Sequence, residues 1–172
     1  HSYMGERPIK RVGYIVVSTD KGLCGGLNVN MFRTLVREMA ELSGKGVGID
    51  LCLLGNKAVS FFRSIGGNVL AALPGVGELP TMSELIGQVR VMLEAYEAGL
   101  IDRLYIVSNE FVNTMTQKPV IRQLLPLDPA EDQALTHRWD YIYEPEAKPL
   151  IEALVIRFIE AQVYQPVIEN QA

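Results

Sequence analysis

Residues 16–28 read VVSTDKGLCGGLN, and this stretch indicates the fold of the chain. An apolar run from Val12 to Ser18 stops in a glycine-rich turn, and a helical pattern opens after the turn. A nearly continuous apolar run is typical of a strand buried on both faces in a parallel sheet. Because a strand, a glycine turn and a helix in this order often mark a nucleotide site, the first question is whether the loop holds a ligand or a partner protein.

Strands and helices alternate after the glycine turn. A helix is expected over residues 30–42, with the side chain of Asn30 as its cap and apolar residues at helical spacing. The other elements expected before residue 128 are a strand over 49–54, a short helix with Ala58, Val59, Phe62 and Ile65 on one side and Gly66-Gly67 at its end, a strand over 68–73, a helix from the capping box Thr81–Glu84 to Gly99, and strands over 104–112 and 119–127.

The end of the chain completes the expected architecture. Residues 113–118 are too few to cross over a sheet, so the strands that they join should pair antiparallel. Residues 128–138 are polar, and from about Glu146 the pattern is helical, with an apolar stripe that needs cover from the sheet alone or also from a partner helix. The sequence predicts an α/β fold: a Rossmann-like, mainly parallel sheet with helices on both faces, an antiparallel hairpin at one end and a long C-terminal helix.

The composition disfavours several classes of function. The 172 residues are 48% apolar and 21% charged, as in a soluble domain with a sizeable core. A net charge of −4 without a run of Lys or Arg disfavours nucleic acid and membrane surfaces as partners, and no apolar segment is long enough to span a bilayer. We expect Cys24 and Cys52 to be reduced thiols in a cytoplasmic protein. Both ends look cut, so a piece of a longer polypeptide is expected.

The glycines of the loop are spaced differently from known phosphate-binding motifs. A dinucleotide fold needs Gly-x-Gly-x-x-Gly, and Gly22, Gly25 and Gly26 differ from it in the first spacing. A phosphate loop needs Gly-Lys-Ser/Thr, whereas a leucine and an asparagine follow the last glycine here. The amides of the turn, with Lys21 nearby, can still bind an anion. The alternative function is therefore a small α/β enzyme that binds a nucleotide or phosphate with the Asp20–Gly26 loop.

Candidate catalytic groups are few. Asp20 follows a buried strand at the end where α/β enzymes keep reactive groups, but a magnesium or phosphotransfer site needs a second acidic residue there. Asp50, Glu78 and Glu110 are the carboxylates that could approach it in space. Ser18 lacks a Gly-x-Ser-x-Gly context and is expected to form hydrogen bonds in the turn. We therefore expect no catalytic residue, no metal site and no cofactor.

Four stretches of the chain resemble a known family. They are residues 11–28, residues 104–109 (LYIVSN), residues 123–127 (QLLPL) and residues 139–145 (WDYIYEP). Together, and in this order, they resemble the γ subunit of bacterial F-type ATP synthases, and the resemblance covers essentially the whole chain.

The resemblance implies a rotor subunit that is not itself an enzyme. The γ subunit is the shaft of the proton-translocating ATP synthase, and its rotation couples proton flow through the c ring to ATP synthesis in the catalytic subunits. It is a peripheral protein at the cytoplasmic face of the bacterial plasma membrane. Residues 1–145 would be its central α/β domain, and residues 146–172 the start of its C-terminal coiled-coil helix, without the partner helix. Pro166 departs from the family pattern because proline removes a helix hydrogen bond.

The resemblance also implies protein partners. They are the ε subunit, the c ring and the catalytic β and α subunits, with no nucleic acid and no direct insertion into the membrane. Carried over residue by residue, the positions near a catalytic β subunit are Asp20, Lys21, Gly22, Leu23, Cys24, Gly25, Gly26 and Asn28. The positions near the ε subunit and the c ring are Glu160 and Tyr164.

Overall fold

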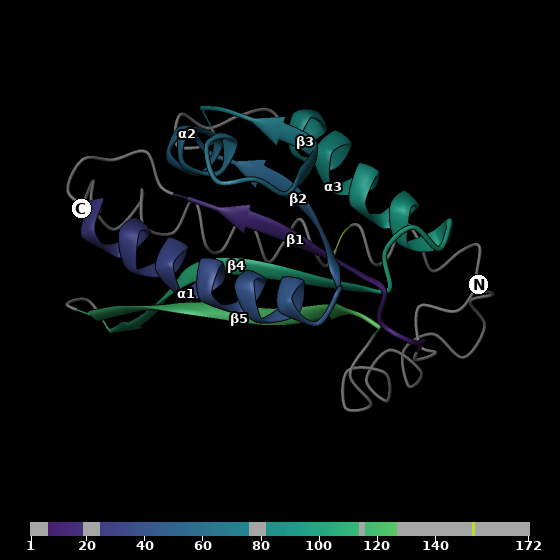
Figure 1. Ribbon diagram of the computed structural model, residues 1–172. Helices are drawn as coiled ribbons and strands as arrows, with labels where there is room; N and C mark the ends of the chain where they lie inside the picture. The colour runs from purple at the N-terminus through teal and green to yellow at the C-terminus, as the bar shows by residue number, and fades with distance from the viewer. Residues whose placement is uncertain (1–6, 19–24, 76–81, 114–115, 127–152, 154–172) are drawn as a thin grey trace.

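The computed structural model describes residues 7–18, 25–75, 82–113, 116–126 and 153 of the chain (Figure 1). Its elements are β1 (Arg11–Val17), α1 (Gly25–Gly44), β2 (Gly48–Leu54), α2 (Asn56–Arg63), β3 (Asn68–Leu73), α3 (Met82–Glu97), β4 (Arg103–Asn113) and β5 (Thr116–Leu125). None of the described helices combines the length and the apolar character needed to cross a membrane. The expected C-terminal helix and the polar loop before it lie outside the described residues.

The five strands form one sheet in the order β3-β2-β1-β4-β5. β1 pairs in parallel with β2 on one side and with β4 on the other, and β2 pairs in parallel with β3. β4 and β5 pair antiparallel, which confirms the expected hairpin at one end. The chain runs outward from β1 to β3 and then returns to the other side of β1. The carboxyl ends of β1 and β4 therefore form the switch point, where ligands bind in open α/β sheets.

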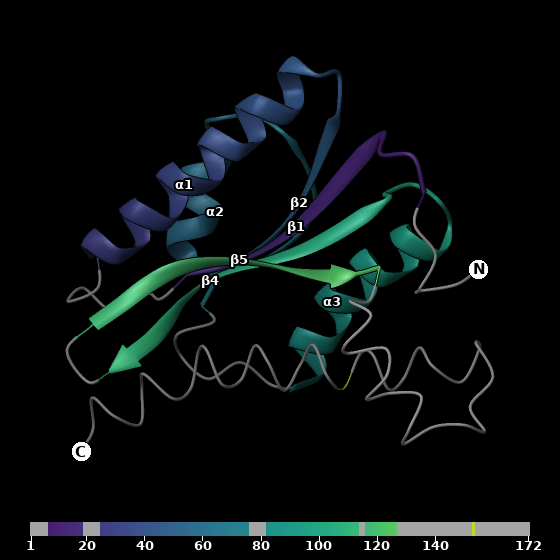
Figure 2. The same ribbon diagram turned by 90° about the horizontal axis from the view of Figure 1, so that it is seen from below.

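Helices cover both faces of the sheet, as the sequence predicts. Figure 2 shows α1 and α2 on one side of the strands and α3 on the other. Successive residues of β1 point to opposite faces, so Tyr14 packs in the cluster with α1 and α2 while Ile15 packs in the cluster with α3. Both residues are fully buried. β1 is thus a central strand with no solvated face, which explains its continuous apolar sequence.

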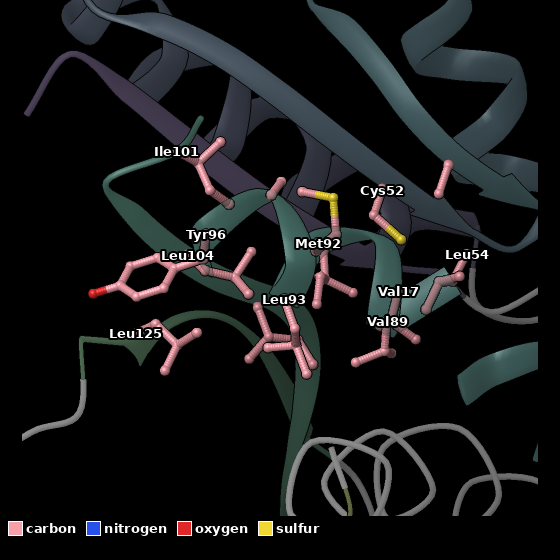
Figure 3. Packing of buried hydrophobic residues seen from close by; sticks show 14 of the residues in the cluster. Val17, Cys52, Leu54, Val89, Met92, Leu93, Tyr96, Ile101, Leu104 and Leu125 are labelled. Atoms are coloured by element: carbon pink, nitrogen blue, oxygen red, sulfur yellow. The ribbon is translucent and has the colours of Figure 1, made fainter. Parts of the chain in front are cut away.

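The core beneath α3 is tightly packed (Figure 3). Gly13 of β1 allows this close approach, because a Cβ atom there would lie 2.8 Å from the side chain of Ile101 and 3.0 Å from that of Met92. The expected apolar stripe of α3 is confirmed, with these members buried: Leu85, Val89, Met92, Leu93 and Tyr96. The helix is followed by Gly99 in a left-handed conformation with φ of 76°, as expected of a residue that ends a helix.

The start of α1 differs from the expectation. The helix begins at Gly25 rather than near residue 30, so Asn30 lies inside it and does not cap it. The carbonyl of Asn30 instead accepts a hydrogen bond from the hydroxyl of Thr34, 2.9 Å away. Asn28, Met31 and Leu35 are all buried, and their spacing extends the buried helical face one turn earlier. This burial outweighs the turn preference of the two glycines at positions 25 and 26.

Two other boundaries also differ. α2 ends at Arg63, so Ile65 follows the helix and is 43% exposed rather than on its apolar side. The cause is the reversal at Gly66 and Gly67, whose φ angles of 106° and 96° turn the chain toward β3. β5 begins at Thr116 rather than at residue 119, because its ladder with β4 continues to Asn113↔Thr116.

Candidate functional site

Hydrogen bonds of Ser18 join the carboxyl ends of β1 and β2 to each other and to the start of α2. Ser18, the residue after β1, is fully buried, and its amide donates to the carbonyl oxygen of Leu54 at 2.9 Å. The amide of Ala58 donates to the Ser18 hydroxyl oxygen at 3.0 Å. α2 starts after Gly55, which has no side chain for a cap, so Ser18 provides the N-cap acceptor from a neighbouring strand. The expectation that Ser18 forms structural hydrogen bonds is confirmed.

This cap occupies the position where a phosphate would approach α2. A helix N-terminus attracts anions through its free amides, and here one of those amides, that of Ala58, already has an acceptor. The amide of Gly55 donates to the carbonyl of Leu73 at 2.8 Å. At the neighbouring end of β4, Asn109 is 7% exposed, and its side-chain oxygen has no hydrogen-bond partner. Apart from this Asn109 oxygen, the polar groups named here join β1, β2, β3 and α2.

Only part of the predicted interface set lies within the described residues. Gly25, Gly26 and Asn28 lie in the first turn and a half of α1, and Asn28 is buried. The other predicted members lie outside the described residues: Asp20, Lys21, Gly22, Leu23, Cys24, Glu160 and Tyr164.

Two of the three carboxylates named as possible partners of Asp20 are paired with arginines elsewhere in the sheet. Asp50 lies four residues before the end of β2, about 13 Å along the strand from Leu54, and it pairs with Arg11. Glu110 pairs with Arg122 at 2.6 Å on the hairpin. Glu78 lies outside the described residues. In the part of the chain that the structure describes, no three His, Cys, Asp or Glu side chains are grouped as metal ligands.

The amino ends of the strands carry a polar network around a buried carboxylate. Asp50 is 4% exposed, and its two oxygens accept from Nε and Nη2 of Arg11 at 2.8 and 2.9 Å. Asn68 on β3 donates to the same carboxylate at 3.0 Å. The carboxylate therefore ties three adjacent strands together. The hydrogen bond and the charge of Asp50 raise the pKa of Arg11, so this guanidinium stays charged.

A tyrosine links the sheet to α1. The hydroxyl of Tyr14 donates to Oε2 of Glu38 at 2.5 Å, and its ring stacks on Tyr105 at 5.5 Å between centroids. Burial, and then the hydrogen bond and charge of Glu38, raise the pKa of Tyr14. The hydroxyl therefore stays protonated and acts as a donor, not as a nucleophile.

The sequence did not predict the pairing of Asp50 with Arg11. The available signal was the position of charged residues at the amino ends of buried strands, where Lys10-Arg11 precedes β1's apolar run and Asp102-Arg103 precedes that of β4. Charged residues that flank an apolar run are usually solvated at the ends of a strand, so this pattern alone does not predict that they pair across the sheet.

Cys52 provides a pH test of the buried core. It is a free thiol with no exposed surface, and burial raises its pKa to about 12. Because the thiol of the unfolded chain ionises near pH 9, the stability from this group is complete below pH 9 and is lost as the pH rises toward 12. Between these values, wild type should lose about 1.4 kcal/mol more per pH unit than a Cys52→Ala variant.

The measurement is urea unfolding of both proteins at several pH values from 8 to 11. Cys24 is present in both proteins, so its titration cancels in the comparison. Equal pH slopes for wild type and Cys52→Ala would contradict the buried, protonated thiol.

Comparison with known proteins supplies the wider context. A family model described as ATP synthase matches residues 1–172. A chain of the Euglena gracilis mitochondrial ATP synthase, from its OSCP/F1/c-ring structure in rotational state 3, is 19% identical with a TM-score of 0.54, and the match covers 95% of this chain and 61% of that one. A chain of the Tetrahymena thermophila mitochondrial ATP synthase, from its central stalk and c-ring structure, is 16% identical with a TM-score of 0.55, covering 96% and 72%.

A further Euglena gracilis chain, from the rotor in rotational state 1, is 22% identical with a TM-score of 0.48, covering 92% and 59%. The present chain thus spans about three fifths of the length of the two Euglena chains. At such identities, the two matches with TM-scores above 0.5 show a shared fold.

Proposed function

Because this chain belongs to the γ family of F-type ATP synthases, we propose that it is a central-stalk subunit whose rotation couples proton flow through the c ring to ATP synthesis. The observation that carries the proposal is the family match over residues 1–172. The proposal places the protein peripherally at the cytoplasmic face of a bacterial plasma membrane. The ATP chemistry belongs to the catalytic subunits, and this chain acts as a rotating part of the stalk that other subunits contact.

The packing of the domain suits this role. Buried clusters on both faces of the sheet join it to α3 on one side and to α1 and α2 on the other. Close-packed interiors are stiff and transmit strain, so a torque applied at one end of such a body reaches the other end. Burial raises the pKa values of Tyr14 and Cys52, so both side chains stay protonated within the core. A shaft needs this stiffness, and it needs to contact the catalytic sites differently at each angle.

We further propose how the chain is divided and which partners it contacts. Residues 1–145 form the α/β domain, and residues 146–172 begin the C-terminal coiled-coil helix. Residues 20–26 and Asn28 approach a catalytic β subunit within the ring of α and β subunits. Glu160 and Tyr164 approach the ε subunit and the c ring. The proposal invokes no nucleic acid and no insertion into the bilayer.

Binding to the ε subunit tests this function. Titration of purified ε into the chain should give a saturable complex, and a Tyr164→Ala variant should bind at least about tenfold more weakly, as when an aromatic anchor is removed. Lys21→Glu is the control, because Lys21 is assigned to the β subunit and its change should leave ε binding intact. Absence of any complex with intact ε would contradict the rotor function.

The alternative enzyme is tested in the same preparation. A nucleotide bound by the Asp20–Gly26 loop at 100 times its Kd would add about 2.7 kcal/mol of stability, or about 5–10 °C in Tm for a chain of this size. We expect no shift with ATP, ADP or NAD. A saturable shift that Lys21→Ala abolishes would favour the nucleotide-binding enzyme instead.

A further inference from the structure

Arg7 joins the segment that enters β1 to the end of α3. Its Nη2 donates to the carbonyl oxygens of Tyr96 and Ile101 at 3.1 and 2.9 Å. Its guanidinium carbon lies 4.1 Å from the centre of the Tyr96 ring, and its Nε lies 3.7 Å from Oδ1 of Asp102. One side chain therefore contacts three residues that are 89 to 95 positions away in the sequence.

These contacts suit an arginine at a helix end. The last carbonyls of a helix lack partners within the helix and carry partial negative charge, and Tyr96 lies in the last turn of α3. Here one nitrogen, Nη2, donates to both carbonyls, and the planar guanidinium also stacks on the aromatic face of Tyr96. Lysine keeps the charge and can donate to a carbonyl but has no planar group to stack on the ring, so it can replace only part of this arrangement.

Asp102 holds the same segment from the other side. Its Oδ2 accepts from the backbone amides of Lys10 and Arg11 at 2.8 and 3.0 Å. Its own amide donates to the carbonyl of Arg11 at 2.8 Å. The parallel ladder between β1 and β4 begins only at Val12↔Arg103. The side-chain contacts therefore extend the attachment of the chain by five residues, from Val12 back to Arg7.

The attachment ends in the hydrophobic core. Tyr96 is 1% exposed and Ile101 is fully buried, and both belong to the cluster beneath α3. Figure 3 shows Tyr96 at one end of this cluster, close to Ile101 and Leu104. A force on the residues before β1 would therefore act on α3 and its core through Arg7 before it acts on the hydrogen bonds between β1 and β4.

We propose that Arg7, Asp102 and Tyr96 form a clamp, the Arg7 clamp, that carries load between the segment entering β1 and the body of the domain. This proposal rests on the rotor function proposed above. Arg7 acts as a positioning residue: it fixes the entering segment so that torque on that segment turns the whole domain. Loss of the clamp should leave the fold intact and weaken the transmission of torque.

The first test is hydrogen exchange in the chain itself. Arg7→Met should raise the exchange rates of the Lys10 and Arg11 amides at least about tenfold, with little change in β2. Arg7→Lys should give an intermediate increase. Unchanged rates in Arg7→Met would mean that Arg7 does not hold the segment, and would overturn the proposal.

The second test uses the assembled ATP synthase with the full-length subunit. The number of protons pumped per ATP hydrolysed should fall at least twofold in Arg7→Met and less in Arg7→Lys. Arg11→Met is the matched control, because it breaks a shorter arginine–aspartate pair, Arg11–Asp50, that lies within the sheet and outside the clamp. It should lower stability but keep the wild-type pumping ratio.

The outcomes separate the two proposals. Faster exchange in Arg7→Met with an unchanged pumping ratio would show that the clamp exists but carries no load, and would leave the rotor function standing. A lowered ratio in Arg11→Met would trace the effect to stability and overturn the clamp. Failure of the wild-type subunit to support assembly or pumping would contradict the rotor function itself.

Discussion

Replacing Leu93 by alanine should lower the free energy of unfolding by about 3 kcal/mol. Leu93 is fully buried in the cluster between α3 and the sheet, as Figure 3 shows. Truncation of a buried leucine removes its transfer free energy and leaves a cavity, at a total cost of about 2–5 kcal/mol. Cys52 and Leu104 contribute to the same cluster from β2 and β4, so several strands would share the cavity and could not easily collapse into it.

Leu100 provides the matched control. It lies in the turn after α3 and is 62% exposed, so Leu100→Ala should change the free energy of unfolding by no more than about 0.5 kcal/mol. Urea unfolding followed by circular dichroism measures both variants. Similar losses in the two variants would mean that α3 is not packed on the sheet as described.

Arg11→Met should have the second largest effect, a loss of about 2–3 kcal/mol. The Asp50 carboxylate is almost completely buried, and Arg11 supplies two of its hydrogen bonds. Removing one member of a buried pair leaves an uncompensated charge, which costs about 3–5 kcal/mol when both members are buried. The Arg11 side chain is 43% exposed, so water can reach part of the vacated space and the expected loss lies below that range.

Two further variants isolate the buried charge as the cause. Arg122→Met breaks the Arg122–Glu110 pair, whose distance is similar but whose side chains are 48% and 27% exposed, and it should cost no more than about 1 kcal/mol. Adding Asp50→Asn to Arg11→Met removes the unpaired charge and should restore part of the lost stability. If Arg122→Met costs as much as Arg11→Met, burial of the carboxylate is not the cause.

Much of the fold follows from local patterns in the sequence. The run Val12–Val17 predicts a central parallel strand because it contains no charged or strongly polar side chain. The structure buries each of these residues. The short connection at residues 113–118 excludes a crossover and so predicts the hairpin. Gly67 and Gly99 follow helices in left-handed conformations that glycine adopts easily. Each of these signals lies within a few residues of the feature that it predicts.

The start of α1 could not be predicted in this way. Gly25 and Gly26 have a strong local preference for turns, and Asn30 looks like a helix cap. The start of the helix is decided by the burial of its own residues Asn28 and Met31. This burial depends on where the sheet lies. Tertiary packing overrides local propensity at such positions.

The candidate site shows the same division. The sequence indicated Ser18 as a hydrogen-bonding residue, but not that its hydroxyl caps α2, because its partner Ala58 is 40 residues away. The carboxylates Asp50 and Glu110 carry no mark in the sequence that tells a catalytic group from a structural one. Their partners, Arg11 and Arg122, become neighbours only through strand pairing.

The sequence by itself determined the class of fold, the buried central strand and the family, because periodicity and contiguous motifs are properties of neighbouring residues. Only the tertiary structure decided the strand order, the Asp50 network and the joining of Arg7 to α3. These features depend on contacts between residues up to 95 positions apart. The free energy of such contacts exists only once the sheet has brought the partners together.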